Sequence, residues 1–423
     1  MKRSLAYRRN NRLGVLLSVA APLLNLGSVH AKPIMPVDAP IPRLLQNVST
    51  YVKRNPRDPN GYYTLGRIHY YAFAAPARQT MPVTRYSGEA NTTELPSGVP
   101  FGNPGRVPAD AQKPQGKPLS RTERIAHIQA AIRNLRRAIA LEQSGAVSSE
   151  PSRKGLSELT LACVYEEGKA DATKLWRDQA IQFYRLAFER SRKEAIQRPT
   201  APIFGIESLV CHEAAKSYLR LVKQGRVHFE EKPKVAEVER TLEQLRRLPQ
   251  SNVVTPIIFS LKRAHPLSSL IAPHPQGMAF DLDGSGRTGQ RYTTWPRSST
   301  GILVWDPTHT GHIGSGRQLF GTATWWMFWQ NGYRALQSLD DSHDGWLTGH
   351  EMSGLAVWTD ANSNGRCDRD EVCSLSEAGI AGINVRESRR IPGGWESRKG
   401  LRLRNGTVLP TYDWLAETVG TAR

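Results

Sequence analysis

Apolar residues recur every three or four positions through most of the chain before residue 250. In the segment 120–143, isoleucine and leucine side chains fall on one side of a helix and charged residues on the other. Ser120, with Glu123 three positions later, forms a capping-box pattern that marks where this helix begins. The same spacing continues in four later segments, which short breaks separate: 156–168, 175–194, 205–225 and 232–248. The pattern predicts an all-α region of consecutive helical hairpins.

Small and large side chains recur at matching places in these predicted hairpins. The first hairpin carries Tyr62, Leu65 and Gly66 and then, after a long insert, Ala131, Leu135 and Ala138. The second carries Leu161, Ala162 and Tyr165, followed by Ala180, Tyr184 and Ala187. This arrangement resembles tetratricopeptide (TPR) repeats, although inserts break the 34-residue period of that family. The resemblance implies that these residues pack the core of a TPR-like domain, and a plain helical bundle is the alternative.

The segment 74–119 interrupts the helical pattern. It is rich in proline and glycine and poor in large apolar residues, so it can neither continue a helix nor build a core. We predict a long surface loop inside a helical domain that spans 32–250.

The pattern changes after residue 251. The run VVTPIIFS, residues 253–260, indicates a short buried strand, and LRLRNGTVLP, residues 401–410, a β-hairpin that turns at Asn405 and Gly406. The segment 351–358 predicts one short helix. Residues 251–423 are therefore predicted to form a small α+β domain with β-hairpins, and the whole chain is predicted to be an α+β multidomain protein.

The first 31 residues have the layout of a cleavable secretory signal peptide. Five cations and no acid precede about 16 mostly apolar residues, and small residues, Val29 and Ala31, precede the predicted cleavage point. The apolar run is shorter than the roughly 20 residues that a membrane-spanning helix needs. We expect an exported protein of the periplasm, the cell envelope or the extracellular medium, with no transmembrane segment in the mature chain.

Positive charge is concentrated in the predicted helical domain. Residues 32–250 contain 35 Lys and Arg against 22 Asp and Glu, whereas residues 251–423 contain 17 against 16. A basic surface on an exported protein suits an anionic envelope polymer or a membrane surface, and nucleic acid is not expected as a partner. A solvated helix surface that binds nothing is the alternative.

Four cysteines follow the predicted signal peptide. An even number in an oxidising compartment permits disulfides. Neighbours in the sequence would pair as Cys163–Cys211 and Cys367–Cys373, and free thiols are the alternative.

Two acidic stretches near the C-terminus have the spacing of a calcium-binding loop. A twelve-residue loop of this kind supplies oxygen ligands from alternate positions, a backbone carbonyl after a glycine turn, and a closing glutamate. In DDSHDGWLTGHE, residues 340–351 (Loop 1), Gly345 makes the turn. The predicted ligands are Asp340, Ser342, Asp344, the Trp346 carbonyl, Thr348 through a water, and Glu351.

The second stretch, DANSNGRCDRDE, covers residues 360–371 (Loop 2) and turns at Gly365. Its predicted ligands are Asp360, Asn362, Asn364, the Arg366 carbonyl, Asp368 and Glu371. The eighth residues of the loops, Leu347 and Cys367, are expected to pair with each other. Solvated turns are the alternative, and two complete matches so close together favour two sites for Ca²⁺.

Two partial turns precede these loops. Asp281 and Asp283 lie in FDLDGSGRTG, which lacks a closing glutamate, and a third site there remains open. The turn at Asp306 has Thr308 and Thr310 where stronger ligands are expected, so we predict that it packs without metal.

The order of motifs from 277 to 385 resembles that of exported bacterial calcium-binding proteins, including haemolysin-type ones. An FDLDG turn, a second acidic turn, an LFG sequence and two complete loops follow one another. The paired loops also resemble those of dockerin modules. The resemblance implies EF-hand-like loops in a calcium-stabilised exported module.

The aromatic run TWWMFWQNGY, residues 324–333, suits either a core or a platform that stacks on carbohydrate, and core packing is the expectation. The sequence contains no G-x-S-x-G turn and no phosphate-cradling loop, so we predict no catalytic residue. We expect a binding or scaffold protein of the cell envelope, whose partner is another protein or an envelope polymer and in which calcium is structural. An envelope enzyme that acts on glycans, with calcium as a structural support, is the alternative.

Overall fold

The computed structural model describes residues 37–74, 80–81, 119–145, 153–197, 206–225, 232–248, 254–284 and 291–418. The predicted signal peptide and nearly all of the predicted insert lie outside these ranges. Residues 31–423 form one compact unit.

The described residues before 250 are mainly helical. The helices are α1 (Ile41–Arg54), α2 (Pro59–Ala74), α3 (Arg121–Gln143), α4 (Leu156–Gly168), α5 (Trp176–Gln197), α6 (Ile206–Lys223) and α7 (Lys232–Arg247), with short strands β1 (Val37–Asp38) and β2 (Thr80–Met81). The five predicted segments match α3 to α7 to within three residues at each end. The capping box is also present, because the Ser120 hydroxyl accepts the Glu123 N–H and the Glu123 carboxylate accepts the Ser120 N–H.

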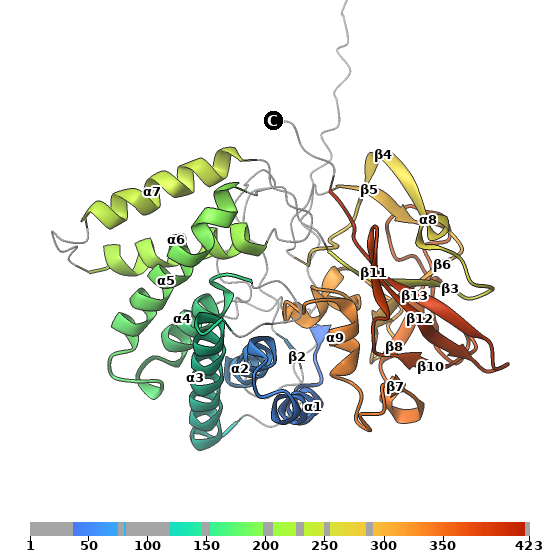
Figure 1. Ribbon diagram of the computed structural model, residues 1–423, viewed down its shortest axis with the longest axis horizontal. Helices are drawn as coiled ribbons and strands as arrows, with labels where there is room; N and C mark the ends of the chain where they lie inside the picture. Colours follow the sequence, from blue (N-terminus) through green and yellow to red (C-terminus); the bar gives the residue numbers. More distant parts are fainter. Residues whose placement is uncertain are drawn as a thin grey trace, which may run out of the picture. The chain divides into compact units, whose positions relative to one another are not determined.

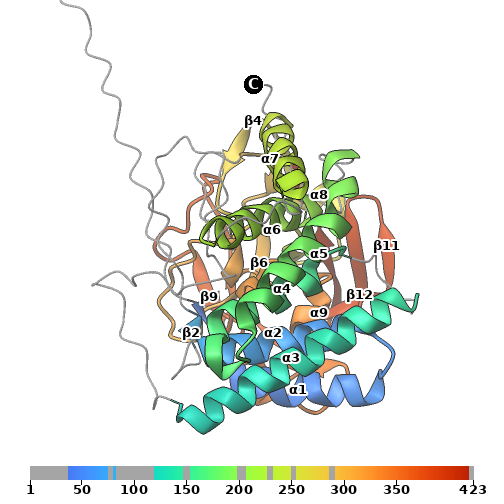
Figure 2. The same cartoon turned by 90° about the vertical axis from the view of Figure 1, so that its left-hand side faces the viewer.

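Each of these helices packs against the next in the chain, as Figure 2 shows for α2 to α6. The closest approach of α2 and α3 occurs at Gly66, where an added Cβ would lie 2.7 Å from Leu135 Cγ. Glycine is therefore required here by space, and the small residues Ala131 and Ala138 on α3 are fully buried. The sequence pattern thus located the contact surface of this hairpin correctly.

The described residues after 254 are mainly strands. They are β3 (Ile257–Ser260), β4 (Ile271–Ala279), β5 (Arg291–Pro296), β6 (Thr300–Trp305), β7 (Trp346–Leu347), β8 (Leu355–Trp358), β9 (Val372–Ser374), β10 (Ile380–Asn384), β11 (Arg389–Ile391), β12 (Gly394–Leu403) and β13 (Val408–Trp414), with short helices α8 (Leu267–Leu270) and α9 (Gly332–Gln337). One antiparallel sheet has the order β7-β10-β12-β13-β3-β6-β8-β9, β11 pairs with β12, and β4 pairs with β5. The chain is therefore α+β. The strand predicted within 253–260 is present as β3 over 257–260, and the hairpin at 401–410 is confirmed.

The central strands of the sheet are buried on both faces. On β6, Leu303 and Trp305 belong to one hydrophobic cluster, while Ile302 and Val304 belong to another. Because successive side chains on a strand point to opposite faces, each face is covered by its own core. Such strands read as continuous apolar runs instead of alternating ones.

The predicted helix over 351–358 is wrong for this reason. A single turn of 3-10 helix covers Gly349–Met352, and the chain then enters strand β8, whose four residues are all buried between β6 and β9. An apolar run that short does not distinguish a buried strand from a buried helix.

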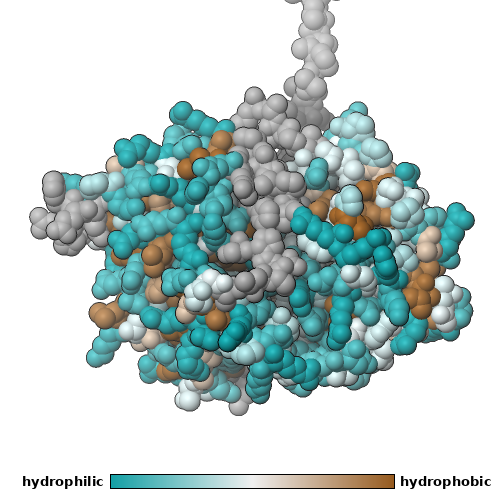
Figure 3. All heavy atoms as spheres, in the orientation of Figure 1, coloured by the Kyte–Doolittle hydropathy of each residue, from teal (hydrophilic) through white to brown (hydrophobic). Residues whose placement is uncertain are grey.

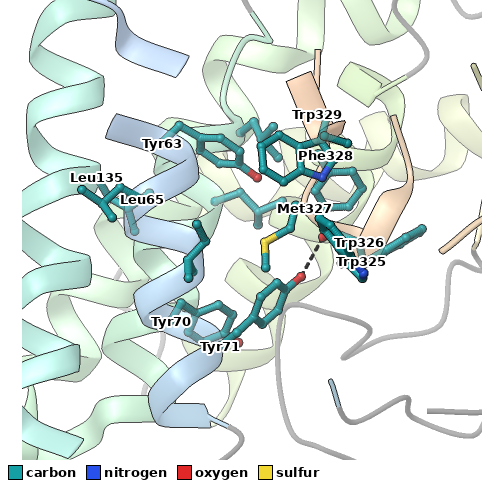
Figure 4. Close-up of a cluster of buried hydrophobic side chains, with 14 of the residues drawn as sticks. Tyr63, Leu65, Tyr70, Tyr71, Leu135, Trp325, Trp326, Met327, Phe328 and Trp329 are labelled. Atoms are coloured by element: carbon teal, nitrogen blue, oxygen red, sulfur yellow. Dashed lines mark hydrogen bonds between the residues drawn. The ribbon is translucent and has the colours of Figure 1, made fainter. Parts of the chain in front are cut away.

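A buried hydrogen-bond cluster joins α2 to the aromatic run of the C-terminal region, and Figure 4 shows its bond between Tyr71 and Trp326. The Trp326 carbonyl accepts bonds from Arg67 Nε at 3.1 Å, Arg67 Nη2 at 2.8 Å and the Tyr71 hydroxyl at 2.7 Å. The Arg67 guanidinium also lies 4.6 Å from the centre of the Phe328 ring, and its side chain is fully buried. Helical and strand-rich regions therefore share one core.

The backbone at this cluster is unusual. Trp325, Trp326 and Phe328 have φ values of 49°, 55° and 54°, in the left-handed region that bulky residues rarely adopt. Such conformations cost of order 1–3 kcal/mol each and persist only where the surroundings hold them. The bonds from α2 to the Trp326 carbonyl are one such restraint.

The outer surface is mainly polar. On the face drawn in Figure 3, hydrophilic side chains predominate and hydrophobic ones form small patches. Leu175 and Val408 are the large hydrophobic residues that are clearly exposed in the described part of the chain. None of the described helices combines the length and the apolar character that crossing a bilayer requires.

All four cysteines are free thiols, so the suggested pairs Cys163–Cys211 and Cys367–Cys373 are not formed. The Cys163 sulfur lies 3.4 Å from the Tyr184 hydroxyl inside the helical core. Closeness in sequence gave no information on distance in the fold.

Replacing Arg67 with methionine is expected to lower the free energy of unfolding by about 3 kcal/mol, because the buried Trp326 carbonyl loses two charged donors. Urea unfolding at pH 7 measures the change. Lysine at position 67 should recover only part of the lost unfolding free energy, because an ammonium group cannot present two N–H donors in one plane to the carbonyl. A methionine variant with an unchanged unfolding midpoint would contradict this assignment.

Acidification is expected to destabilise the protein through His69. Its Nδ1 lies 2.9 Å from His127 Nδ1, and burial, with the charges of His127 and Arg133, lowers the pKa of His69 to about 4. A histidine whose folded pKa lies below its unfolded value near 6.5 stabilises fully above pH 6.5 and loses that contribution as pH falls toward 4. The stability of wild type relative to His69→Gln should therefore fall by up to about 3 kcal/mol between pH 7 and pH 4.

Urea titrations of both proteins at several pH values measure this difference. His265→Gln is the matched control, because His265 is not paired with another histidine. A difference between wild type and His69→Gln that stays constant across this range would refute the role of the histidine pair.

Candidate metal centre

Loop 1 folds around the carboxylate of its first residue. Asp340 Oδ2 accepts the Gly345 N–H at 3.0 Å, and Asp340 Oδ1 accepts the Ser342 hydroxyl at 3.3 Å. Gly345 has a φ of 93°, so glycine suits the turn at the sixth position. The first, third and sixth positions are thereby brought together.

The closing glutamate of Loop 1 joins the same cluster. Glu351 is buried, its Oε1 accepts the Ser342 N–H at 2.8 Å, and its Oε2 accepts the Thr348 N–H at 3.0 Å. Thr348 and Glu351 form a reciprocal capping box at the start of the 3-10 turn. The twelfth position therefore reaches back to the third and the ninth.

Loop 2 repeats this network. Asp360 Oδ2 accepts the Gly365 N–H at 2.8 Å. Glu371 accepts the Ala361 N–H at 2.9 Å and the Asp368 N–H at 3.0 Å. Two loops that start twenty residues apart thus share a glycine turn, an inward first aspartate and a closing glutamate.

Amide side chains occupy the middle positions of Loop 2. Asn362 Nδ2 and Asn364 Nδ2 both donate to Asp368 Oδ2, at 2.8 and 2.7 Å. These two bonds hold the pKa of Asp368 below its ordinary value. The fifth residue accepts the N–H of the seventh at 2.7 Å in both loops, Asp344 from Trp346 and Asn364 from Arg366.

Carboxylates lie close together in Loop 1. Burial raises the pKa of Asp340, and the negative charges of Glu351 and Asp344 raise it further. Proximity of like charges is costly without a counter-charge. A cation bound in Loop 1 would offset this repulsion.

The side chains present fit a hard cation in their chemistry. Every predicted side-chain ligand in both loops offers oxygen, the donor that Ca²⁺ prefers. Within the described ranges, no three His, Cys, Asp or Glu side chains are grouped as a metal site. The predicted donor sets depend instead on Ser, Thr, Asn and backbone oxygens beside the acids.

The predicted pairing of the eighth residues is wrong. Leu347 pairs with Ile383 in the β7–β10 ladder, and the Cys367 thiol donates to the Gly311 carbonyl at 3.3 Å. The two loops lie at different places in the sheet order, since β7 stands at one end of that order and β9, which follows Loop 2, at the other. They therefore do not form the face-to-face pair of a dockerin-like module.

Loop 1 is held by helix α1, which the sequence did not suggest. Arg43 Nε donates to Asp341 Oδ1 at 2.8 Å, and Arg43 Nη2 donates to the Glu351 carbonyl at 3.0 Å. Asn47 Nδ2 donates to Asp341 Oδ1 at 2.7 Å and to the Ser338 carbonyl at 2.9 Å. Asn47 is a buried polar residue on the apolar face of α1, and that break in the pattern was the available signal.

Loop 2 is held by tryptophans of the second core. Trp295 Nε1 donates to Asp360 Oδ2 at 2.6 Å, and Trp358 Nε1 donates to Glu371 Oε2 at 3.2 Å. A Cβ added to Gly365 would lie 2.5 Å from Met278 Sδ. Trp295 lies far outside the twelve-residue motif, and the motif does not specify Trp358. The sequence therefore did not predict either of these hydrogen bonds.

The turn at Asp306 closes on itself. Asp306 accepts the N–H groups of Thr310 and Gly311, each at 2.9 Å. Gln318 Nε2 donates to the His312 carbonyl at 3.0 Å, so an amide donor faces the carbonyl that a metal would otherwise use. These contacts favour the packing role expected for this turn.

A buried arginine stands beside Asp281 and Asp283. Arg317 Nε donates to the Gly284 carbonyl at 2.6 Å, and burial lowers the pKa of Arg317 to about 10 against the opposing charges of the two aspartates. A fixed cation near these carboxylates disfavours a metal ion at the same place.

The aromatic run 324–333 lies inside the protein. Trp325, Trp326 and Trp329 are at most 4% exposed, and their rings pack in edge-to-face and tilted contacts. A carbohydrate platform needs exposed rings, so these residues serve the core, as expected.

Part of the chain is similar in sequence to a known domain family. The model of the SPM domain matches residues 269–396, which include both loops. The iron-regulated protein FrpA of Neisseria meningitidis serogroup C is 30% identical over 131 residues, which is 26% of this chain and 12% of that protein. The chain therefore spans about an eighth of that relative's length.

The contact of Arg43 with Asp341 can be tested by a double-mutant cycle. Both side chains are mostly buried, so the coupling energy between Arg43→Met and Asp341→Asn is expected to be about 1 kcal/mol or more in urea unfolding. The exposed pair Arg247 and Glu243 on α7 is the control and should couple by about 0.5 kcal/mol or less. Equal coupling in the two cycles would contradict a specific role for α1 in holding Loop 1.

Proposed function

We propose that residues 251–423 form a calcium-stabilised, EF-hand-like module in which Loop 1 and Loop 2 each bind one Ca²⁺. The observation that carries this proposal is the shared network of the two loops. In each, the first aspartate accepts the N–H of the turn glycine, and the closing glutamate accepts backbone N–H groups from both arms of the loop. Simple solvated turns would not require a closing glutamate in both.

The residues that would hold the ions are those of the sequence pattern. In Loop 1 they are Asp340, Ser342, Asp344, the Trp346 carbonyl, Thr348 through water and Glu351. In Loop 2 they are Asp360, Asn362, Asn364, the Arg366 carbonyl, Asp368 and Glu371. A bound cation neutralises the clustered carboxylates, and its role is structural.

We propose further that the chain is an exported binding or scaffold protein of the cell envelope. The stacked hairpins support a TPR-like scaffold, since Gly66, Ala131 and Ala138 pack as that resemblance implies. The excess of basic residues in 32–250 supports an anionic partner. A glycan-acting enzyme would use exposed aromatic rings to stack on its substrate, and the aromatic run 324–333 is buried.

Calcium titration of the full chain tests the module. Isothermal titration is expected to give two ions per chain, and Glu351→Gln and Glu371→Gln should each remove one, because each loses the ligand that contributes two oxygens. Free Ca²⁺ at a hundred times the dissociation constant should stabilise wild type by about 2.7 kcal/mol per site, seen as a higher melting temperature.

Glu417→Gln is the matched control, because Glu417 is exposed and lies outside both loops. It should keep both ions. Wild type that binds no calcium at millimolar concentration, and melts at the same temperature in chelator, would overturn the proposal.

A further inference from the structure

A polar pocket of about 640 Å³ opens beside Loop 1. The C-terminal end of α1 and the turn after it form one side, and α9, Loop 1 and the segment after β10 supply the rest. Four arginines line it: Arg54, Arg57, Arg334 and Arg386. Its volume lies within the range of small-molecule sites, but its lining is far more polar and cationic than usual.

The carboxylates of the pocket do not neutralise these arginines. The lining residues include two, Asp58 and Asp340. Asp58 accepts the Tyr51 hydroxyl at 2.7 Å and the Asn60 N–H at 3.0 Å, and Asp340 is held by Loop 1. None of the four arginines forms an ion pair with a described residue, so an excess of positive charge faces the pocket.

Arg334 is held by the surrounding structure, whereas Arg386 is exposed and lies beside Loop 1. Arg334 donates through Nη1 to Gln337 Oε1 at 2.8 Å and lies 5.8 Å from the centre of the Tyr51 ring. Arg386 lies over the turn of Loop 1, because a Cβ added to Gly345 would be 3.0 Å from Arg386 Nε. Arg54 and Arg57 are exposed and face them from the other side.

We propose that this pocket binds an organic ligand that carries more than one phosphate group. A guanidinium group presents several N–H donors in a plane and pairs with two phosphate oxygens at once. Four such groups from three segments offer more donors than one anionic group can use. The side-chain amides of Asn55 and Gln337, which also line the pocket, supply neutral donors for the rest of the ligand.

This inference deepens the proposed envelope-binding role and rests on it for the source of the ligand, a phosphate-bearing polymer. Both regions of the chain contribute arginines to the pocket. Arg54 and Arg57 belong to the basic region 32–250, and Arg334 and Arg386 belong to residues 251–423. Charge from both regions converges on one site.

Isothermal titration of the full chain, saturated with calcium, with fructose 1,6-bisphosphate tests the proposal. Wild type is expected to bind this probe more tightly than inorganic phosphate and more tightly than the dicarboxylate glucarate, and not to bind fructose. The double variant Arg57→Gln/Arg386→Gln should bind it at least about tenfold more weakly, because it loses two charged donors. Added salt should weaken wild-type binding.

The control is Arg240→Gln/Arg297→Gln, which removes the same charge from exposed arginines outside the pocket. It should keep wild-type affinity. Equal losses in both double variants, no binding by wild type, or binding of phosphate or glucarate as tight as that of the bisphosphate would each overturn the proposal. If melting shows that Arg57→Gln/Arg386→Gln is unfolded, the exposed pair Arg54→Gln/Arg57→Gln replaces it and must show the same loss.

Calcium titration of the pocket variant separates the two hypotheses. Neither Arg57 nor Arg386 is a predicted calcium ligand, so the variant should still bind two calcium ions per chain. A wild-type chain that binds the bisphosphate but no calcium would overturn the proposed module and leave the pocket standing. A chain that binds calcium but no bisphosphate would overturn the pocket alone.

Discussion

One backbone carbonyl connects the two halves of the described fold. The Trp326 carbonyl accepts three hydrogen bonds from α2, two from the Arg67 guanidinium and one from the Tyr71 hydroxyl. A fully buried arginine is costly unless its donors are satisfied, and here they restrain an aromatic run whose backbone is in a rarely populated region. Removing Arg67 takes two of the three donors from this carbonyl, so helices and sheet depend on one another at this point.

The two loops use a similar internal network but different outer supports. Loop 1 rests on α1 through Arg43 and Asn47, whereas Loop 2 rests on the second core through Trp295 and Trp358. An ion in Loop 1 would therefore also influence how α1 docks, while an ion in Loop 2 would act on the sheet. Calcium in such a protein would hold separate contacts in place, and not open a hinge between paired loops.

The arginine pocket is physically connected to Loop 1. It shares Asp340 with Loop 1, and Arg386 covers the glycine turn of the same loop. A cation in the loop would remove one of the two carboxylate charges from the pocket wall. Anion binding and calcium binding would then favour each other through local electrostatics.

The sequence by itself determined the elements whose signals are local. Helices α3 to α7 follow from apolar spacing and the cap at Ser120, and the glycine turns and closing glutamates of the loops follow from positions within twelve residues. Which residues pack against these elements was decided only by the tertiary structure. Strand β8 was misread as a helix because both its faces are buried and no alternation remains. The contacts of Arg43 with Asp341 and of Arg67 with Trp326 join residues more than 250 positions apart, and the four arginines of the pocket come from three separate stretches of the chain. These long-range contacts depend on how the elements pack, and tertiary packing produces no periodic pattern along the sequence.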